Sequence, residues 1–274
     1  MFPLGPYDRG VHDSPDTADV LLVVPTLGRR LGYLRQTLES IRSQGVLADV
    51  VIVAPEGRPE LRSLGESFGA EFLPDPGSLP GAINAGIAAR GSAYPFVSWL
   101  NDDDFLEPGS LAETRRLLLT NPKASVAFGS CRYVDSDGRE LWISGAGRWA
   151  PFVLPWGPDL IPQPGMLVRS GAWRAVGGLD ESFRLAFDLD LLLKLKKIGR
   201  LVHTDSIVSN FRWHGDSLTV DDRGTNIRES ERAKRASLGP WARRCAWIWE
   251  APVRVATRAA ANEVQRRARR KSDR

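Results

Sequence analysis

Short runs of apolar residues alternate with segments of helical period along the first hundred positions. Buried strands are predicted where the apolar runs are continuous, at residues 20–24, 50–54, 70–73 and 95–100. Helices are predicted where apolar residues recur every three or four positions, at residues 31–41, 60–68 and 81–89. Strands that alternate with helices require right-handed crossovers, so the pattern predicts a parallel, doubly wound sheet with a ligand crevice at the carboxyl ends of its strands.

The second half of the chain has a different pattern. Ser110 and Glu113 have the spacing of a capping box, which predicts a helix to residue 119. Strands are predicted at residues 125–128, 131–134 and 139–143, the last two forming a hairpin, and helices at residues 170–176 and 188–198. Residues 144–165 are rich in Gly, Pro and Trp, and so long an irregular stretch is typical of a binding loop.

Three loops leave the carboxyl ends of predicted strands, at residues 25–30, 55–58 and 101–104. The last contains Asp102, Asp103 and Asp104 in succession. Like charges this close repel one another, and Mg²⁺ or Mn²⁺, which prefer oxygen ligands, would relieve that repulsion and also bind a diphosphate. The alternative is a solvated acidic turn that caps the helix beginning near Ser110.

Composition limits the classes of protein to consider. The 274 residues, 42% of them hydrophobic, are enough for one core domain and an appendage. Residues 225–274 hold 14 Lys and Arg against 5 Asp and Glu, and the rest of the chain holds 23 against 28. The positive charge therefore lies in the C-terminal segment, which argues against a nucleic-acid-binding face on the domain. Cys131 and Cys245 lack the spacing of a zinc site or a disulfide framework.

The sequence also has no run long enough to span a membrane and no signal-peptide core, so a cytoplasmic protein is expected. Seven further motifs follow one another along the chain. They are PTLGR from Pro25, VIVAPEG from Val51, INAG from Ile83, LNDDDFLEPGSL from Leu100, IPQPGMLVR from Ile161, VGGLDESFRLAFDLDLLLKL from Val176 and FRWHGDSLT from Phe211. In this order and spacing they resemble the family 2 glycosyltransferases.

This resemblance implies an α/β fold of the GT-A type, a Rossmann-like, doubly wound, mostly parallel sheet with a smaller acceptor-side region. It also implies a nucleotide-sugar donor, a divalent cation, Mn²⁺ or Mg²⁺, and inversion at the anomeric carbon. The expected organisation is an N-terminal extension (1–18), a glycosyltransferase domain (19–224) with a nucleotide-binding half (19–104) and an acceptor half (105–224), and a basic, helical Trp/Arg-rich tail (225–274).

Matching the motifs residue by residue assigns the donor site. Pro25, Thr26 and Arg29 fall in the first nucleotide loop, Glu56 on the acidic position that receives the base, and Asn84 on an RNxG-like stretch in which Ile83 replaces Arg. Turn chemistry for the two loops and a helix-cap role for Asn84 are the alternatives.

The family's DxD element falls on Asn101, Asp102 and Asp103, which implies that these residues contact the donor and that Asp103 ligates the metal. His214 matches a family histidine that ligates the metal or contacts the diphosphate. With Arg212 and Ser217 it would form a flap over the donor.

Asp188 matches the second residue of an ED-type element in which Phe187 replaces Glu, so it is the candidate general base. Amides at the helix start are expected to favour its ionised form, and the alternative is a residue that only caps the helix. Gln163 and Trp156 are candidates for the acceptor side. Trp142 and Trp149 could also stack on sugars, and packing is the alternative for all three tryptophans.

The tail interleaves Trp with Arg, which suits an anionic membrane surface. The alternative is that its tryptophans pack back on the domain.

The expected function is transfer of a sugar from a nucleotide donor to a hydroxyl of a glycan or lipid-linked acceptor, at the inner face of the plasma membrane. A non-catalytic carbohydrate- or nucleotide-binding relative is the alternative, since Pro55, Asn101 and Phe187 depart from the family pattern. A sugar-phosphate nucleotidyltransferase is disfavoured, because residues 25–30 contain only one glycine, Gly28.

Overall fold

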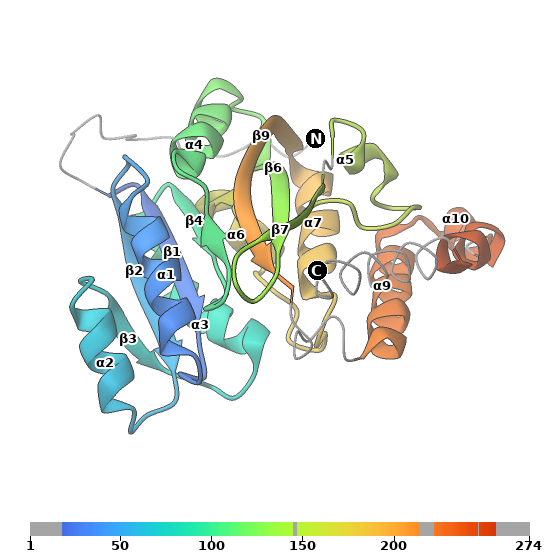
Figure 1. Cartoon of the computed structure of the whole chain (residues 1–274). Coiled ribbons are helices and arrows are strands. Elements are labelled where there is room, and N and C mark those ends of the chain that lie inside the picture. Colours follow the sequence, from blue (N-terminus) through green and yellow to red (C-terminus); the bar gives the residue numbers. More distant parts are fainter. Residues whose placement is uncertain (1–17, 145–146, 214–221, 246, 256–274) are drawn as a thin grey trace.

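The first half of the protein consists of strands that alternate with helices, as the apolar runs predict. The structure is a computed structural model that describes residues 18–144, 147–213, 222–245 and 247–255. The elements are β1 (Val20–Pro25), α1 (Leu31–Arg42), β2 (Ala48–Ala54), α2 (Pro59–Glu66), β3 (Glu71–Pro74), α3 (Leu79–Arg90), the 3-10 helix η1 (Gly91–Ala93) and β4 (Phe96–Trp99). The strands pair in parallel in the order β3-β2-β1-β4, so their carboxyl ends meet at one edge of the sheet (Figure 1).

The second half extends the same sheet with strands of both directions. Its elements are β5 (Phe105–Leu106), α4 (Ser110–Thr120), β6 (Ala124–Val134), β7 (Glu140–Ser144), α5 (Ala150–Val153), β8 (Leu167–Arg169), α6 (Ser170–Val176), α7 (Phe187–Ile198), β9 (Arg200–Arg212), α9 (Arg223–Ser237) and α10 (Pro240–Arg244). β8 lies antiparallel between β4 and β6, β9 runs parallel to β6, and β7 forms the predicted hairpin with β6. The sheet is thus mixed but mostly parallel, as expected.

Three strands of this half, β5, β8 and β9, were not predicted, and two strands that were predicted separately form the single strand β6. β6 runs through residues 125–128 and 131–134 without a break and accommodates register shifts against β9. β5 and β8 are too short for a periodic signal. β9 begins with a polar and partly exposed stretch that includes His203 and Asp205, so it lacks the apolar run that identified the other strands.

The predicted capping box of α4 is absent. Gly109, in the left-handed region at φ 78°, is the N-cap residue, and no side chain caps the helix. The Ser110 hydroxyl instead lies 2.9 Å from Gln44 Oε1, and Glu113 pairs with Arg116 at 2.9 Å. The Ser110 side chain therefore connects α4 to the end of α1 rather than capping its own helix.

Helices cover both faces of the sheet. Because side chains alternate along a strand, Val20, Leu22 and Val24 of β1 pack toward α1, α2 and α4, whereas Leu21 and Val23 pack toward α3, α6 and α7. A Cβ atom at Gly86 of α3 would lie 2.7 Å from the Val23 methyl groups, so only glycine permits this close approach of helix and strand.

The C-terminal segment is partly docked on the domain. α9 packs beside α7 (Figure 1), and residues 247–255 are helical and carry Trp249, whose ring lies edge-on to Trp156 at 4.8 Å. By contrast, Trp241 and Trp247 are 80% and 69% exposed. Among the described residues, no helix has both the length and the apolar character that crossing a membrane requires. Both cysteines are free.

Candidate functional site

A cleft of about 930 Å³ opens at the carboxyl ends of the parallel strands, where the fold predicts the ligand crevice. Four groups of residues predicted from sequence meet in it: the first loop, the acidic loop, the start of α7 and the irregular segment before β8. The predicted site residues that line it are Pro25, Thr26, Arg29, Asn101, Asp102, Asp103, Trp156, Gln163 and Asp188.

The first loop and the acidic loop are joined directly. β1 and β4 are neighbours in the sheet, and the Thr26 hydroxyl donates a hydrogen bond to the Asp102 carboxylate. Thr26 Oγ1 also accepts from the Gly28 amide at 2.9 Å, in a turn that Gly28 permits with φ 67°. Burial raises the pKa of Asp102 and the charge of Asp103 adds to this, while the Thr26 hydrogen bond opposes it. A bound cation would relieve this repulsion.

The third carboxylate of the acidic run points away from the cleft. Asp104 is fully buried and accepts hydrogen bonds from the Arg212 amide at 3.0 Å and from Asn101 Nδ2 at 3.2 Å. Its pKa is raised well above the ordinary value, chiefly by burial. The run therefore supplies two carboxylates to the cleft, Asp102 and Asp103, and one to the interior.

The interior side of the acidic loop is held by Arg212. Its guanidinium contacts Gln36 Oε1 at 2.5 Å, donates to the carbonyl oxygens of Asp103 and Ser136 at 3.1 and 2.8 Å, and lies 4.1 Å from the centre of the Tyr33 ring. The expectation that Arg212 belongs to a closing flap is wrong, because its side chain is buried and fixed. Its predicted partners there, His214 and Ser217, lie outside the described residues. Within the described part of the chain, no three His, Cys, Asp or Glu side chains group to hold a metal ion.

Asp188 occupies the first turn of α7 and faces the cleft. Its Oδ1 accepts from the Leu189 amide at 2.8 Å. Burial raises the pKa of Asp188 to about 6, against the opposing effect of backbone hydrogen bonds. The expected dominance of the helix amides is therefore wrong. Asp188 is also not the helix cap, since Ala186 is the N-cap residue and no side chain caps α7 from that position.

Phe187, which stands where Glu is usual, is a packing residue. Its ring is buried and lies 6.4 Å from that of Trp99, at the end of β4, and Trp99 in turn meets Trp173 of α6 at 6.0 Å. The aromatic contact anchors the start of α7 to the strand that leads into the acidic loop. The next acidic residue of the helix, Asp190, is buried and pairs with Lys194 at 2.6 Å.

A second carboxylate beside Asp188 was missed by the sequence analysis. Asp159 lies in the irregular segment, lines the cleft, and accepts from the Ile161 amide at 3.1 Å. Solvent reaches it from the cleft, but the surrounding protein raises its pKa to about 7, with the charge of Asp188 adding to the shift and Lys234 opposing it. The available signal was an isolated acid within a segment already predicted to be a binding loop.

The acceptor-side candidates differ in how firmly they are held. Gln163 is buried, and its Nε2 donates to the Trp99 carbonyl at 3.0 Å. Trp156 is half exposed against Trp249. Trp142 stacks on Tyr133 at 4.3 Å, which favours the packing interpretation for that residue, and the exposed Trp149 is not among the described residues that line the cleft.

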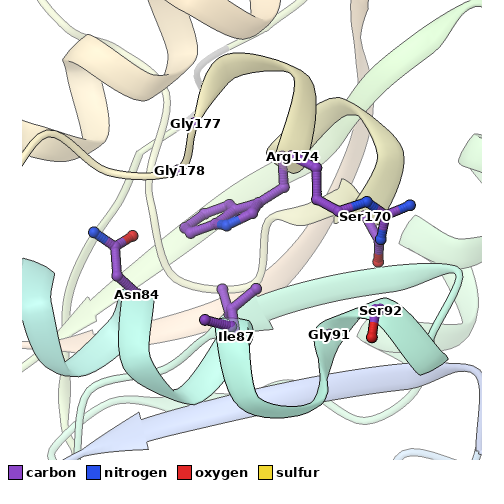
Figure 2. Close-up of a pocket in the computed structure, with 10 residues that line it drawn as sticks. Asn84, Ile87, Gly91, Ser92, Ser170, Arg174, Gly177 and Gly178 are labelled. Atoms are coloured by element: carbon purple, nitrogen blue, oxygen red, sulfur yellow. The ribbon is translucent and has the colours of Figure 1, made fainter.

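Two predicted donor residues are likewise absent from the described lining of the cleft. Glu56 is exposed beyond the end of β2. Asn84 lies on α3 at a smaller cavity of about 430 Å³, where Figure 2 shows it facing the Gly177–Gly178 turn. Asn84 donates to the Leu179 carbonyl at 2.9 Å and to Glu181 at 3.0 Å, and it accepts from the Leu179 amide. These contacts connect α3 to the loop that leads into α7.

The relatives found by comparison with known proteins include proteins much longer than this chain. No protein-family model matches the chain. A chondroitin synthase of Pasteurella multocida is 23% identical over 201 residues, 70% of this chain and 20% of that protein. The O-antigen biosynthesis protein RfbC of Myxococcus xanthus is 31% identical over 194 residues, 65% of this chain and 14% of that protein. The chain thus spans a fifth or less of these relatives.

Solved structures share the fold. TarS 1–349 of S. aureus in complex with UDP-GlcNAc has a TM-score of 0.61 at 13% identity, covering 80% of this chain and 66% of that one. The mannosyltransferase PcManGT of Pyrobaculum calidifontis, in complex with GDP-Man and Mn²⁺, has a TM-score of 0.58 at 16% identity, covering 91% and 76%. The expectation from the motifs is confirmed: this is a GT-A protein related to the family 2 glycosyltransferases.

Proposed function

We propose that the protein is an inverting glycosyltransferase that moves a sugar from a nucleotide donor to a hydroxyl of a glycan or lipid-linked acceptor. The observation that carries the proposal is the position of Asp188. A carboxylate whose pKa is raised to about 6 faces the same cleft as the acidic loop. A general base is most effective when its pKa lies near the working pH, and burial provides that here.

The donor is proposed to bind at the carboxyl ends of β1 and β4. Pro25, Thr26 and Arg29 lie at the first of these ends, and Asn101, Asp102 and Asp103 follow the second. UDP-GlcNAc and GDP-Man occupy structures with the same fold, which supports a nucleotide-sugar donor without choosing its base. The roles of Glu56 and Asn84 in donor binding remain predictions.

The residues of the acidic loop fit a divalent cation. Asp102 and Asp103 repel each other, and Mg²⁺ or Mn²⁺ binds through one or two carboxylates together with substrate phosphates. Asp103 would hold the ion, with His214 as a second proposed ligand. When bound, the cation supplies positive charge to the diphosphate leaving group.

A residue of this chain would accept the proton of the acceptor hydroxyl. The acceptor hydroxyl oxygen forms the new bond to the anomeric carbon as the bond to the diphosphate breaks, and Asp188 takes the hydroxyl proton. Asp159 is proposed to lie beside the acceptor, since it shares the cleft and its ionisation depends on the charge of Asp188. Gln163 and Trp156 line the same side.

Calorimetric titration with UDP, dTDP, GDP and CDP, each with Mn²⁺ and with EDTA, tests the donor site. We expect one nucleotide to bind in a metal-dependent way. Asp103→Ala should lose that binding and Glu60→Ala, which removes an exposed acid of α2, should keep it. Equal binding by wild type and Asp103→Ala would remove Asp103 from the metal site. No binding of any nucleotide would favour a non-catalytic relative.

We also propose that the C-terminal segment contacts an anionic membrane surface. Trp241, Trp247 and Ile248 are exposed beside the exposed Arg243 and Arg244. Such a surface can place indoles among lipid headgroups and arginines at phosphates. Flotation with vesicles containing phosphatidylserine should recover the protein, and Trp241→Ala with Trp247→Ala should reduce recovery. No recovery with anionic vesicles would exclude this contact.

A further inference from the structure

The helix that carries Asp188 has no side-chain cap of its own. α7 begins at Phe187, its N-cap residue is Ala186, and the backbone before it comes from a turn that lines the cleft at residues 184–186. Amides at a helix start have no partner inside the helix, so something else must hold them and set the direction in which the helix begins.

Glu229 of α9 binds the amide of the N-cap residue and the two amides of the turn before it. Its carboxylate accepts from the Arg184 amide at 3.0 Å, from the Leu185 amide at 2.8 Å and from the Ala186 amide at 3.0 Å. Burial acts to raise the pKa of Glu229, but the three amides together outweigh it and the pKa is lowered. A carboxylate held by three consecutive amides fixes the position of all three peptide units.

α9 is also held in place by two residues that follow Glu229. Arg232 lies 3.8 Å from the centre of the Phe183 ring and donates to the Ser182 carbonyl at 2.9 Å. Lys234, two residues after Arg232, donates from Nζ to the Gly157 carbonyl at 2.6 Å, two residues before Asp159. The helix therefore contacts the backbone next to both acids of the acceptor side.

We propose that Glu229 is a positioning residue for the reaction, and that it holds residues 184–186 so that Asp188 points into the cleft. This inference rests on the proposed function, since it concerns the base of that reaction. It also assigns α9, the first helix of the basic C-terminal segment, to the catalytic unit.

Three substitutions separate positioning from stability. Glu229→Gln keeps one acceptor oxygen but turns a donor amide group toward backbone amides, Glu229→Asp keeps the charge on a shorter side chain, and Arg228→Gln changes an exposed residue of the same helix. Misplacing a catalytic group by about 1 Å can cost about 100-fold in rate. We therefore expect a 10- to 100-fold lower kcat for Glu229→Gln, a smaller loss for Glu229→Asp, and no loss for Arg228→Gln.

The experiment measures full-length variants in two ways. The first is release of UDP or GDP from UDP-N-acetylglucosamine or GDP-mannose with Mn²⁺, water serving as acceptor, which gives kcat and the donor KM. The second is hydrogen exchange of the amides at residues 184–186, which needs no turnover. Positioning predicts a lower kcat, a donor KM within about twofold of wild type, and exchange at least about tenfold faster in Glu229→Gln.

The outcomes are distinguishable. Wild-type turnover with an unchanged kcat in folded Glu229→Gln would overturn the positioning role and leave the proposed function intact, as would kcat and KM changing in proportion. No turnover by wild type with either donor, together with no binding of any of the four nucleotides, would contradict the proposed function and, with it, the role of Glu229 toward a base. The exchange measurement would still show whether Glu229 holds the turn.

Discussion

Replacing Asp188 by Asn should stabilise the protein while it abolishes transfer. The wild-type carboxylate must ionise in a partly buried position, and its raised pKa measures the free energy that this costs. Asn has nearly the same shape and never ionises. The variant therefore loses the proton acceptor and no longer carries a desolvated charge. This is the trade-off between activity and stability that is expected at a catalytic residue.

The magnitude and its pH dependence follow from the two pKa values. The pKa of Asp188 is about 6 in the folded protein and 3.8 ordinarily. At about 1.4 kcal/mol per pH unit the difference is roughly 3 kcal/mol, and partial solvent access reduces it to roughly 1–2 kcal/mol. Between these values the folded state binds more protons than the unfolded state. The contribution of Asp188 to wild-type stability therefore falls as the pH rises from about 4 to 6, and the advantage of Asp188→Asn grows across that window.

Urea unfolding of both proteins at pH 4, 5, 6, 7 and 8 measures this difference. We expect a similar free energy of unfolding at pH 4 apart from the isosteric change itself, a rising advantage of the variant to about pH 6.5, and a plateau above. A difference between the two proteins that is independent of pH would contradict this prediction, because it would show that Asp188 ionises in the folded state as easily as in water.

Two further predictions concern neighbouring acids. The pH profile of nucleoside diphosphate release by the wild type should show two ionisations, near pH 6 and near pH 7, because Asp188 and Asp159 titrate as a pair in two steps. Asp159→Asn should keep the ionisation near pH 6 and lose the one near pH 7. A wild-type profile with one ionisation would contradict the coupling of the two acids. Asp104→Ala should lower the free energy of unfolding in urea by about 2–4 kcal/mol, because it leaves the Arg212 amide and the Asn101 side chain without their buried acceptor. Asp104→Asn, which keeps an acceptor oxygen, should cost less, and equal losses in the two variants would indicate a role for charge alone.

The sequence predicted the parts of the fold that carry a strong local signal. Apolar runs located β1, β2 and β4, and the loops that follow β1 and β4 proved to line the cleft. β9 was missed because its partly exposed start is polar, and the pairing of β6 with both β8 and β9 depends on contacts between segments far apart in the chain.

The site residues likewise divide into those that sequence motifs located and those whose role depends on the three-dimensional structure. Motif positions placed Asp103 and Asp188 in the cleft, but no pattern distinguishes Asp104, which turns into the core, from the two carboxylates before it. The pKa of Asp188 depends on burial among elements that converge only in three dimensions. The hydrogen bonds of Glu229 to residues 184–186 join positions more than forty residues apart, which sequence spacing alone does not reveal.

The most direct test of the proposed function compares wild type with Asp188→Asn in nucleotide-sugar binding and turnover. Both proteins are titrated with UDP-N-acetylglucosamine and with GDP-mannose in Mn²⁺, and release of the nucleoside diphosphate is then followed. We expect both proteins to bind one of these donors with similar affinity, and only the wild type to release the nucleoside diphosphate at a measurable rate. Comparable release by the two proteins would contradict the role of Asp188 as the base.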